Sequence, residues 1–201
     1  AGIEVKPIIT LGGSHTVNMV HLTDVKVPVE NRVGEEGKGW GYAKGLLAHE
    51  RTGLAGISKS LAALQNLRKQ ASQVKRGNGT LLDDPSYRAK LAELEIDLMA
   101  TEFTELRSLA SAANGAEPGP ESSILKLKGT EIQQRIQKLT VEAGGIYSAA
   151  WGPMPVGHLF ARGGMSGYLS SRAYTIYGGA SEVQRDVIAK NVLGIKKSQS
   201  K

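Results

Sequence analysis

The stretch GWGYAKGLLAHERTGLAGISKSLAAL, residues 39–64, decides the fold class of this chain of 201 residues. Its apolar residues recur at alternating steps of three and four, which places them on one face of a helix. The stripe consists of Trp40, Ala43, Leu47, Glu50, Leu54, Ile57, Leu61 and Leu64. We expect one long helix that begins at Gly39 and ends near the turn Gly77-Asn78-Gly79.

Four further helical regions follow along the chain. Asp84-Pro85 predicts a helix start, because Asp caps free amides and proline fits the first helical position; this helix extends to Gly115. A third helix is expected at residues 122–144, and shorter helices at 165–177 and 181–193. The residues expected to point inward are Leu91, Leu94, Leu98, Leu106, Leu109, Ala113, Leu125, Ile132, Ile136, Leu139 and Ala143. The sequence therefore predicts a mainly α protein, an antiparallel helical bundle.

The first part of the chain has a different pattern. Residues 3–28 are rich in Val, Ile and Thr, with Gly12-Gly13 in the middle, which predicts two or three short strands joined by turns. So few strands do not form a stable sheet alone. We expect residues 1–35 to be the C-terminal remnant of a β domain and residues 36–201 to be a helical bundle domain.

Composition excludes several classes of protein. There is no cysteine, so disulfides and thiolate metal sites are excluded, and a reducing compartment such as the cytoplasm is expected. No apolar run is long enough to span a membrane. The net charge is +6, which suits an anionic ligand such as a nucleotide or CoA. The basic residues are scattered and not interleaved with aromatic residues, so we expect no nucleic-acid binding.

Glu50 is the one charged member of the stripe in residues 39–64. Burial penalises a carboxylate and raises its pKa towards the range of a general base. A structural ion pair, with Arg51 or an arginine of another helix, explains the same position, and spacing alone favours that alternative. His49-Glu50 is not a metalloprotease motif, because Gly53 stands where the second histidine is required. No other histidine has a partner at metal-ligand spacing.

Two glycine pairs are the remaining candidates for a binding site. Gly178-Gly179 precedes Ser181 and Gln184, which have the spacing of a capping box. A glycine turn before a helix start exposes backbone amides that bind phosphate, although ordinary capped turns look the same. Gly144-Gly145 is explained by a helix C-cap.

Taken together, these segments resemble the C-terminal half of the acyl-CoA dehydrogenase family. The resemblance rests on GIEV (2–5), VKVP (25–28), NRVG (31–34), GKGW (37–40), HER (49–51) and IYGGASEVQR (176–185), in the family's order, with Ile188-Ala189 and Leu193-Gly194 after them. It spans essentially the whole chain. Residues 94–107, PGPESSILK (118–126) and Gly129-Thr130-Glu131 further resemble large subunits of the pimeloyl-CoA dehydrogenase type, which the family pairs with a smaller homologous subunit.

The resemblance implies FAD chemistry on an acyl-CoA thioester with a trans-2-enoyl-CoA product. Many members carry the base glutamate directly after the tyrosine of the C-terminal signature, where this chain has Gly178. A minority carry it on the first bundle helix before an arginine, which implies Glu50 as the base and Arg51 as a substrate contact. The cofactor-binding residues that the resemblance implies are Gly144, Gly145, Gly179, Ala180 and Glu182.

Some family contacts are replaced in this sequence. Ala180 replaces the threonine that the family usually has at this position, whose hydroxyl helps to hold the flavin. Val141 stands for a glutamine before Gly144-Gly145, which in the family approaches the adenine end of a neighbour's FAD. The usual Arg-x-x-Phe-Gly loop is absent near Arg76-Gly77.

The resemblance also implies partners: an acyl-CoA substrate, an electron-transfer acceptor protein, and a homo- or hetero-tetramer. A fragment of this kind is expected to be inactive alone. The alternative is a non-catalytic structural subunit of a heteromeric acyl-CoA dehydrogenase. Glu50 argues against that alternative, whereas Ala180 and Val141 argue for it. An unrelated basic binding module would need a clustered basic face, which the sequence lacks.

Overall fold

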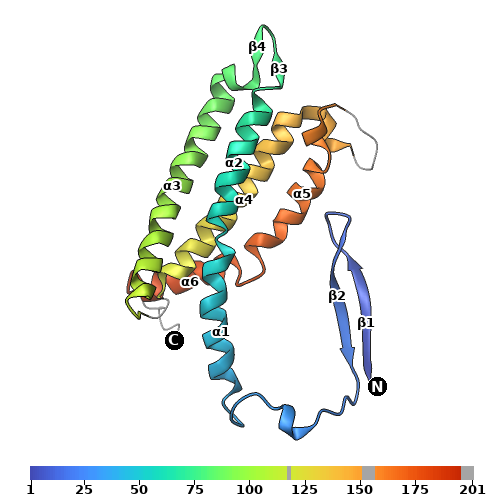
Figure 1. Ribbon diagram of the computed structural model, residues 1–201, viewed down its shortest axis with the longest axis vertical. Helices are drawn as coiled ribbons and strands as arrows, with labels where there is room; N and C mark the ends of the chain where they lie inside the picture. Colours follow the sequence, from blue (N-terminus) through green and yellow to red (C-terminus); the bar gives the residue numbers. More distant parts are fainter. Residues whose placement is uncertain (117–118, 151–156, 196–201) are drawn as a thin grey trace, which may run out of the picture.

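The computed structural model describes residues 1–116, 119–150 and 157–195, while the side chains of residues 48–54 lie outside this description. It confirms the mainly α fold that the sequence predicts. Figure 1 shows helices side by side in a bundle, with the N-terminal β-hairpin beside it. No helix in the described ranges is long and apolar enough to cross a membrane.

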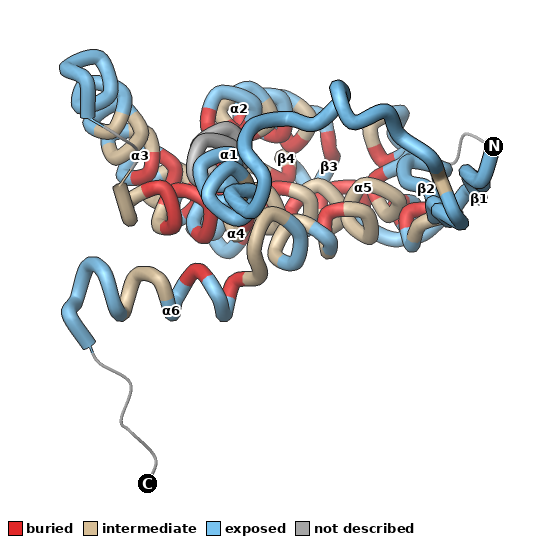
Figure 2. The backbone as a smooth tube through the Cα atoms, turned by 90° about the horizontal axis from the view of Figure 1, so that it is seen from below, coloured by how far each residue is buried: buried red, intermediate tan, exposed pale blue. Residues whose placement is uncertain are grey.

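Helix α4, Glu121–Gly144, lies at the centre of the bundle. It contacts α1 (Gly39–Leu54), α2 (Ile57–Ala71), α3 (Pro85–Ala113), α5 (Gly164–Ser170) and α6 (Ser181–Asn191). All the inward residues predicted for α4 are buried, as are Leu91, Leu94 and Leu98 of α3. In Figure 2 the buried residues gather on α2, α3 and α4. The core therefore lies between these three helices, and α4 also supports the elements after it.

The first predicted helix is two helices. Gly56 has a φ of +58°, a left-handed conformation that favours glycine and interrupts the helix between α1 and α2. The three/four spacing continues across the break, so periodicity alone did not reveal it. After α2, a short hairpin of β3 (Lys75–Arg76) and β4 (Gly79–Thr80) turns at Gly77-Asn78, as expected for the end of the helical run. The 3₁₀-helix η2, Leu81–Asp83, leads from it into α3.

The N-terminal half of α1 protrudes from the bundle (Figure 1). Trp40 and Leu47 of the predicted stripe are exposed, whereas Ile57 and Leu64 are buried. Among the described side chains of the stripe, full burial is therefore found in its α2 half.

The last turns of α3 also differ from the prediction. Leu106, Leu109 and Ala113 were expected to point inward, but all three are exposed. Burial in α3 ends at Thr101. Beyond it, polar residues of α3 face an open cleft of about 430 Å³ next to the start of α4, and Leu106, Leu109 and Ala113 do not line this cleft. This cleft is lined by Thr104, Arg107, Ser108, Ser111, Glu121 and Ile124.

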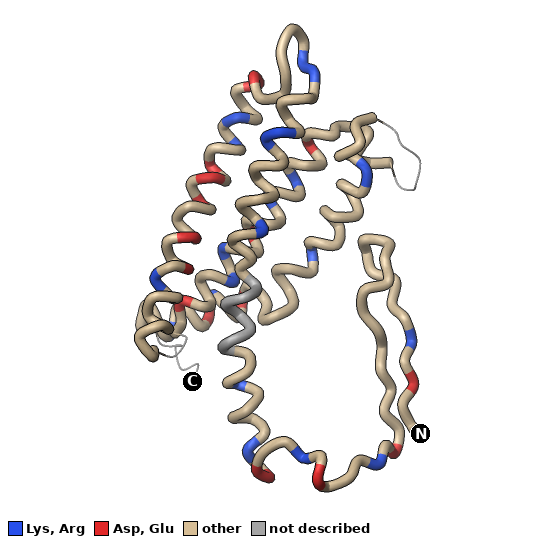
Figure 3. Tube along the Cα trace, viewed as in Figure 1, with Lys and Arg blue, Asp and Glu red and all other residues tan. Residues whose placement is uncertain are grey.

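Residues 1–35 contain the antiparallel strands β1 (Ile3–Ile9) and β2 (His15–Leu22), followed by the 3₁₀-helix η1 (Val29–Asn31). Every residue of both strands is exposed, including apolar ones such as Val5 and Met19. Few charged residues cover the hairpin (Figure 3). Its tip meets the bundle, where the Ser166 hydroxyl of α5 donates to the Gly12 carbonyl.

Candidate functional site

Two 3₁₀-helices, η3 (Gly145–Ala149) and η4 (Leu159–Ala161), precede α5, and a third, η5 (Ser171–Thr175), continues it; a glycine turn then leads to α6. Gly178 and Gly179 in this turn have φ values of +63° and +93°. Both values lie in the left-handed region, which a residue with a side chain adopts only with strain.

The expected capping box at Ser181 and Gln184 is not formed. Ala180 occupies the N-cap with φ −57° and ψ 152°, and α6 has no side-chain cap. Ser181 is therefore already the first helical residue, one position too late for its hydroxyl to cap the helix. The Ser181 hydroxyl and both amide atoms of Gln184 are buried without a hydrogen-bond partner. A Cβ on Gly179 would lie 2.1 Å from the Gln184 Nε2 atom, and the φ of +93° would strain any residue with a side chain, so glycine is favoured at this position.

The uncapped start of α6 can hold an anion. Its first-turn amides have no intrahelical acceptor, and the helix dipole adds a partial positive charge at this end. Gln184 is fully buried, and its unpartnered amide lies directly beneath the same turn. Glu182 is exposed in the first turn, where its carboxylate can accept hydrogen bonds from ligand hydroxyls.

Side chains of helix α4 hydrogen-bond to the Gly178-Gly179 turn and to the segment before it. The Lys126 ammonium, fully buried, donates to the carbonyl oxygens of Tyr174 at 3.1 Å and Gly179 at 2.7 Å. About two helical turns further along α4, the Gln134 amide donates to the Ser171 carbonyl at 2.9 Å and the Thr175 hydroxyl at 3.1 Å. The backbone path from η5 into α6 is thus tied to a single stretch of α4.

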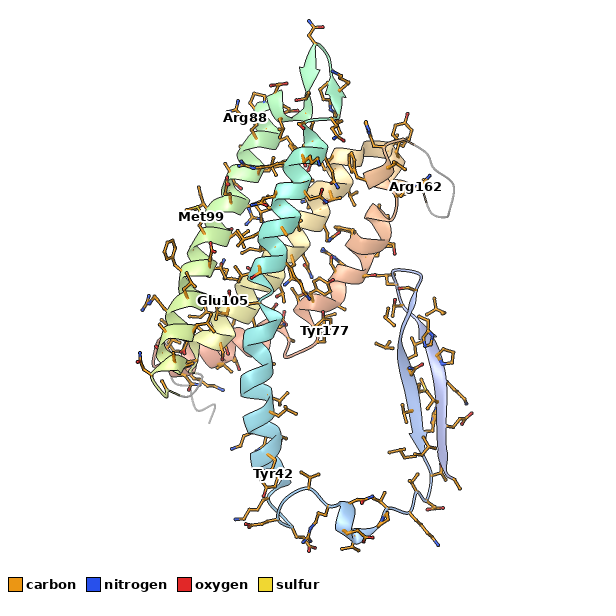
Figure 4. The ribbon with its side chains drawn as sticks, in the orientation of Figure 1. Tyr42, Arg88, Met99, Glu105, Arg162 and Tyr177 are labelled. Carbon is orange, nitrogen blue, oxygen red and sulfur yellow. The ribbon has the colours of Figure 1, made fainter. Side chains whose placement is uncertain are left out.

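Two other contacts complete this arrangement. Arg185 of α6 pairs with Glu131 of α4 at 2.9 Å. The rings of Tyr174 and Tyr177 meet edge to face, with centroids 5.8 Å apart. Partial burial, with a smaller contribution from Tyr174, raises the pKa of Tyr177. Figure 4 shows Tyr177 below α5, in the segment that follows η5.

The same stretch of α4 also fixes the end of α1. Gly129 packs directly against Ala55, and a Cβ there would lie 2.4 Å from the Ala55 carbonyl oxygen. The Gln133 amide donates to that oxygen at 3.0 Å. Residues 126–134 of α4, about 12 Å of helix, therefore carry both the C-terminal end of α1 and the glycine turn before α6.

The predicted base and its neighbour are on that end of α1. Glu50 and Arg51 lie in the helical backbone of α1, one to two turns before Ala55. Their side chains lie outside the described residues, so their roles stay predictions.

Gly144-Gly145 is not part of this arrangement. It lies 18 residues after Lys126 on the same helix, which corresponds to about 27 Å. Gly144 allows close packing, since a Cβ there would lie 2.0 Å from the Ser148 hydroxyl. Gly145 is exposed and ends the helix with a φ of +57°. Within one chain, the two glycine pairs are therefore at opposite ends of α4.

Lys126 was not among the predicted site residues. In the sequence, Lys126 is one of two lysines, with Lys128, near the start of a predicted helix. The signal that could have singled it out is its position directly after Leu125, which is predicted to point inward. Among the described residues there is no group of three or more His, Asp and Glu that could hold a metal ion.

Comparisons with known proteins agree with this geometry. Residues 37–193 match the family model described as acyl-CoA dehydrogenase, C-terminal domain. The acyl-CoA dehydrogenase FadE26 of Mycobacterium tuberculosis is 31% identical over 201 residues, covering 98% of this chain and 50% of that protein. The ChsE4-ChsE5 complex of the same organism contains a chain with 30% identity and a TM-score of 0.81, covering 98% of this chain and 51% of that one.

A structure named the Tcur3481-Tcur3483 steroid ACAD has a TM-score of 0.83 and 28% identity, with 98% of this chain and 50% of that chain covered. The chain thus spans about half the length of these relatives. None of these names refers to pimeloyl-CoA, so the narrower resemblance to that type stays a prediction.

Proposed function

Because this chain belongs to the acyl-CoA dehydrogenase family, as its C-terminal domain, we propose that it is part of a flavin-dependent enzyme that converts an acyl-CoA thioester to a trans-2-enoyl-CoA. One observation carries the proposal. Residues 126–134 of α4 hold both the end of α1, which contains Glu50, and the glycine turn that begins α6. The proposed base and the proposed cofactor contact are thereby supported by one rigid element.

The residues present fit an anionic dinucleotide such as FAD. The uncapped start of α6 supplies backbone amides for a phosphate, and Gly179 leaves room for close approach. Ala180 contributes no hydroxyl, so binding here relies on main-chain amides and on the exposed Glu182 carboxylate. When bound, FAD accepts the hydride that leaves the β carbon of the substrate.

Glu50 is the proposed general base. Its carboxylate takes the α proton of the thioester, and the electron pair of that C–H bond becomes the new C=C bond as hydride leaves the β carbon with its own electron pair. Gly178 has no side chain that can do this. Arg51, the next residue, is the proposed substrate contact and can attract the anionic CoA moiety.

Residues 1–35 are proposed to be the end of a β domain, and residues 36–201 the helical domain. The wholly exposed β1–β2 hairpin supports this division, since two strands with apolar residues on the surface are marginal in water. The remaining strands of a β domain would cover it. A cytoplasmic location stays a prediction.

The proposed assembly is a homo- or hetero-tetramer that passes electrons to an acceptor protein. One relative is named as the ChsE4-ChsE5 complex, and another, 29% identical over 174 residues, as the CarC subunit of a caffeyl-CoA reductase-Etf complex in Acetobacterium woodii. Gly144-Gly145 lies about 27 Å along α4 from Lys126, the residue that contacts the Gly178-Gly179 turn. It is therefore proposed to meet a neighbouring subunit's cofactor.

Anaerobic mixing of the complete FAD-containing enzyme with acyl-CoA thioesters tests the proposal. The panel includes pimeloyl-CoA, straight-chain acyl-CoAs and a steroid-linked acyl-CoA. At least one is expected to bleach the flavin and to yield an enoyl-CoA lighter by two hydrogens. An enzyme that binds FAD but is reduced by no thioester would contradict it. The 201-residue chain alone is expected to bind FAD weakly and to show no activity.

A further inference from the structure

Lys126 is a fully buried lysine whose ammonium donates to two main-chain carbonyls, those of Tyr174 and Gly179. Lysine is almost never fully buried without partners, because desolvating an ammonium is costly. A hydrophobic residue would fill the same space between α4 and α6 without that cost. The contacts of Lys126 with the glycine turn therefore require an explanation beyond packing.

The contact with Gly179 fixes the direction of an amide that faces the other way. In a planar trans peptide, the C=O and the following N–H point to opposite sides. Because the Gly179 oxygen points to the Lys126 ammonium inside the protein, the Ala180 N–H points away from it. Ala180 is the N-cap of α6, so this amide joins the uncapped amides of the first turn.

The turn depends on such an anchor. Gly178 and Gly179 both have positive φ, and glycine has more conformational freedom than any other residue. No side chain caps α6, and the buried Gln184 amide has no hydrogen-bond partner that would hold the turn. Lys126 reaches both ends of the segment 174–179, which restricts the orientations that its peptides can adopt.

We propose that Lys126 is a positioning residue, which holds the Gly178-Gly179 turn so that the Ala180 amide and the first-turn amides of α6 face the anionic cofactor. This inference rests on the proposed function for the identity of the ligand. The Lys126 ammonium thus sets the direction of the amides that bind the cofactor, although it does not contact the cofactor itself.

The test compares Lys126→Met with Lys126→Arg and Lys128→Met in the complete enzyme. Methionine keeps the length and removes the donors, whereas arginine keeps the charge and donors. Lys128 is half-exposed and makes only a 3.6 Å ion pair with Glu131, so it is the matched control. The readouts are the FAD dissociation constant, the melting temperature, and hydrogen exchange of amides 178–184 in the FAD-free protein.

Lys126→Met is expected to speed exchange at amides 178–184, because the turn loses its anchor, and to weaken FAD binding about tenfold, which corresponds to about 1.4 kcal/mol. Lys126→Arg should recover part of the affinity, and Lys128→Met should leave both readouts unchanged. A lower melting temperature with unchanged exchange and FAD affinity would overturn the proposal. If Lys126→Met does not fold, Lys126→Gln, which keeps one donor group, decides by the same two readouts. Should the unmodified enzyme bind no FAD, the proposed function fails, while the exchange data still test the anchoring of the turn.

Discussion

At the scale of single residues, Tyr87 ties the two long helices of the core together. Its side chain is buried on α3, and its hydroxyl donates to the Leu139 carbonyl of α4 at 3.0 Å. Tyr87→Phe removes this hydrogen bond and leaves the ring in place. We expect the free energy of unfolding to fall by about 1 kcal/mol, measured by urea denaturation at neutral pH.

The same residue predicts an alkaline pH dependence. Burial, with a smaller effect of the Glu142 carboxylate, raises the pKa of Tyr87 above its ordinary value of about 10. Above that pH the unfolded chain loses the phenol proton while the folded protein keeps it, so the stability contributed by Tyr87 falls as pH rises. The difference in stability between the natural protein and Tyr87→Phe should therefore shrink above about pH 10. A constant difference up to pH 11 would contradict this assignment.

Residue identity in the proposed site was only partly predictable. Glu50 could be singled out because a charge interrupts an otherwise apolar stripe. Lys126 could not, because its role comes from carbonyls that lie 48 and 53 residues later in the chain. Sequence spacing reports neighbours on one helix, whereas these contacts depend on how helices pack.

At the scale of elements, the crossing of α1 and α4 depends on Gly129. A Cβ there would lie 2.6 Å from the Ala55 Cα and 2.4 Å from its oxygen, both backbone atoms that cannot move aside. Gly129→Ala should therefore destabilise the protein by about 1–3 kcal/mol through overpacking, although alanine favours a helix. Gly41→Ala, on α1 with nothing within 4 Å, is the control and should be neutral or slightly stabilising. Thermal unfolding of both variants compares them, and equal stability would refute the close crossing.

Element prediction succeeded where the signal was local. Asp84-Pro85 predicted the start of α3, and the Asp84 carboxylate indeed accepts from the Ser86 amide at 2.8 Å. The capping box of α6 was wrong by one residue, because Ala180 rather than Ser181 adopts the N-cap conformation. The break at Gly56 was missed because the apolar period continues across it. An isolated glycine between two leucine-rich stretches was the signal that could have found it.

At the scale of the whole molecule, α3 carries an apolar stripe that faces away from the core. Ile96, Met99, Phe103 and Leu106 are each at least half exposed, and Met99 points outward in Figure 4. Four large apolar residues on one helix face are typical of an interface with another protein. We expect another dehydrogenase subunit to cover this stripe in the proposed tetramer.

Phe103→Glu tests this expectation. A charge in the middle of a buried apolar interface is desolvated without a partner, so the assembly should dissociate or shift to a smaller species. Ser86→Glu, which places the same charge at an exposed position near the start of α3, about 15 Å before Ile96, should leave the assembly intact. Light scattering of the complete enzyme measures both. An unchanged mass for Phe103→Glu would show that the interface lies elsewhere.

The central claim is that Glu50 removes the α proton of the acyl-CoA, and Glu50→Gln in the complete enzyme tests it most directly. Glutamine keeps the shape of the side chain but cannot accept the proton. Reduction of the flavin by acyl-CoA, followed by stopped flow, should slow by about a hundredfold to ten-thousandfold, while acyl-CoA binding and the melting temperature stay close to those of the unmodified enzyme. Glu30→Gln, at an exposed position of η1, is the control and should react normally. Near-normal flavin reduction in a folded Glu50→Gln enzyme would contradict the account and place the base in a partner subunit.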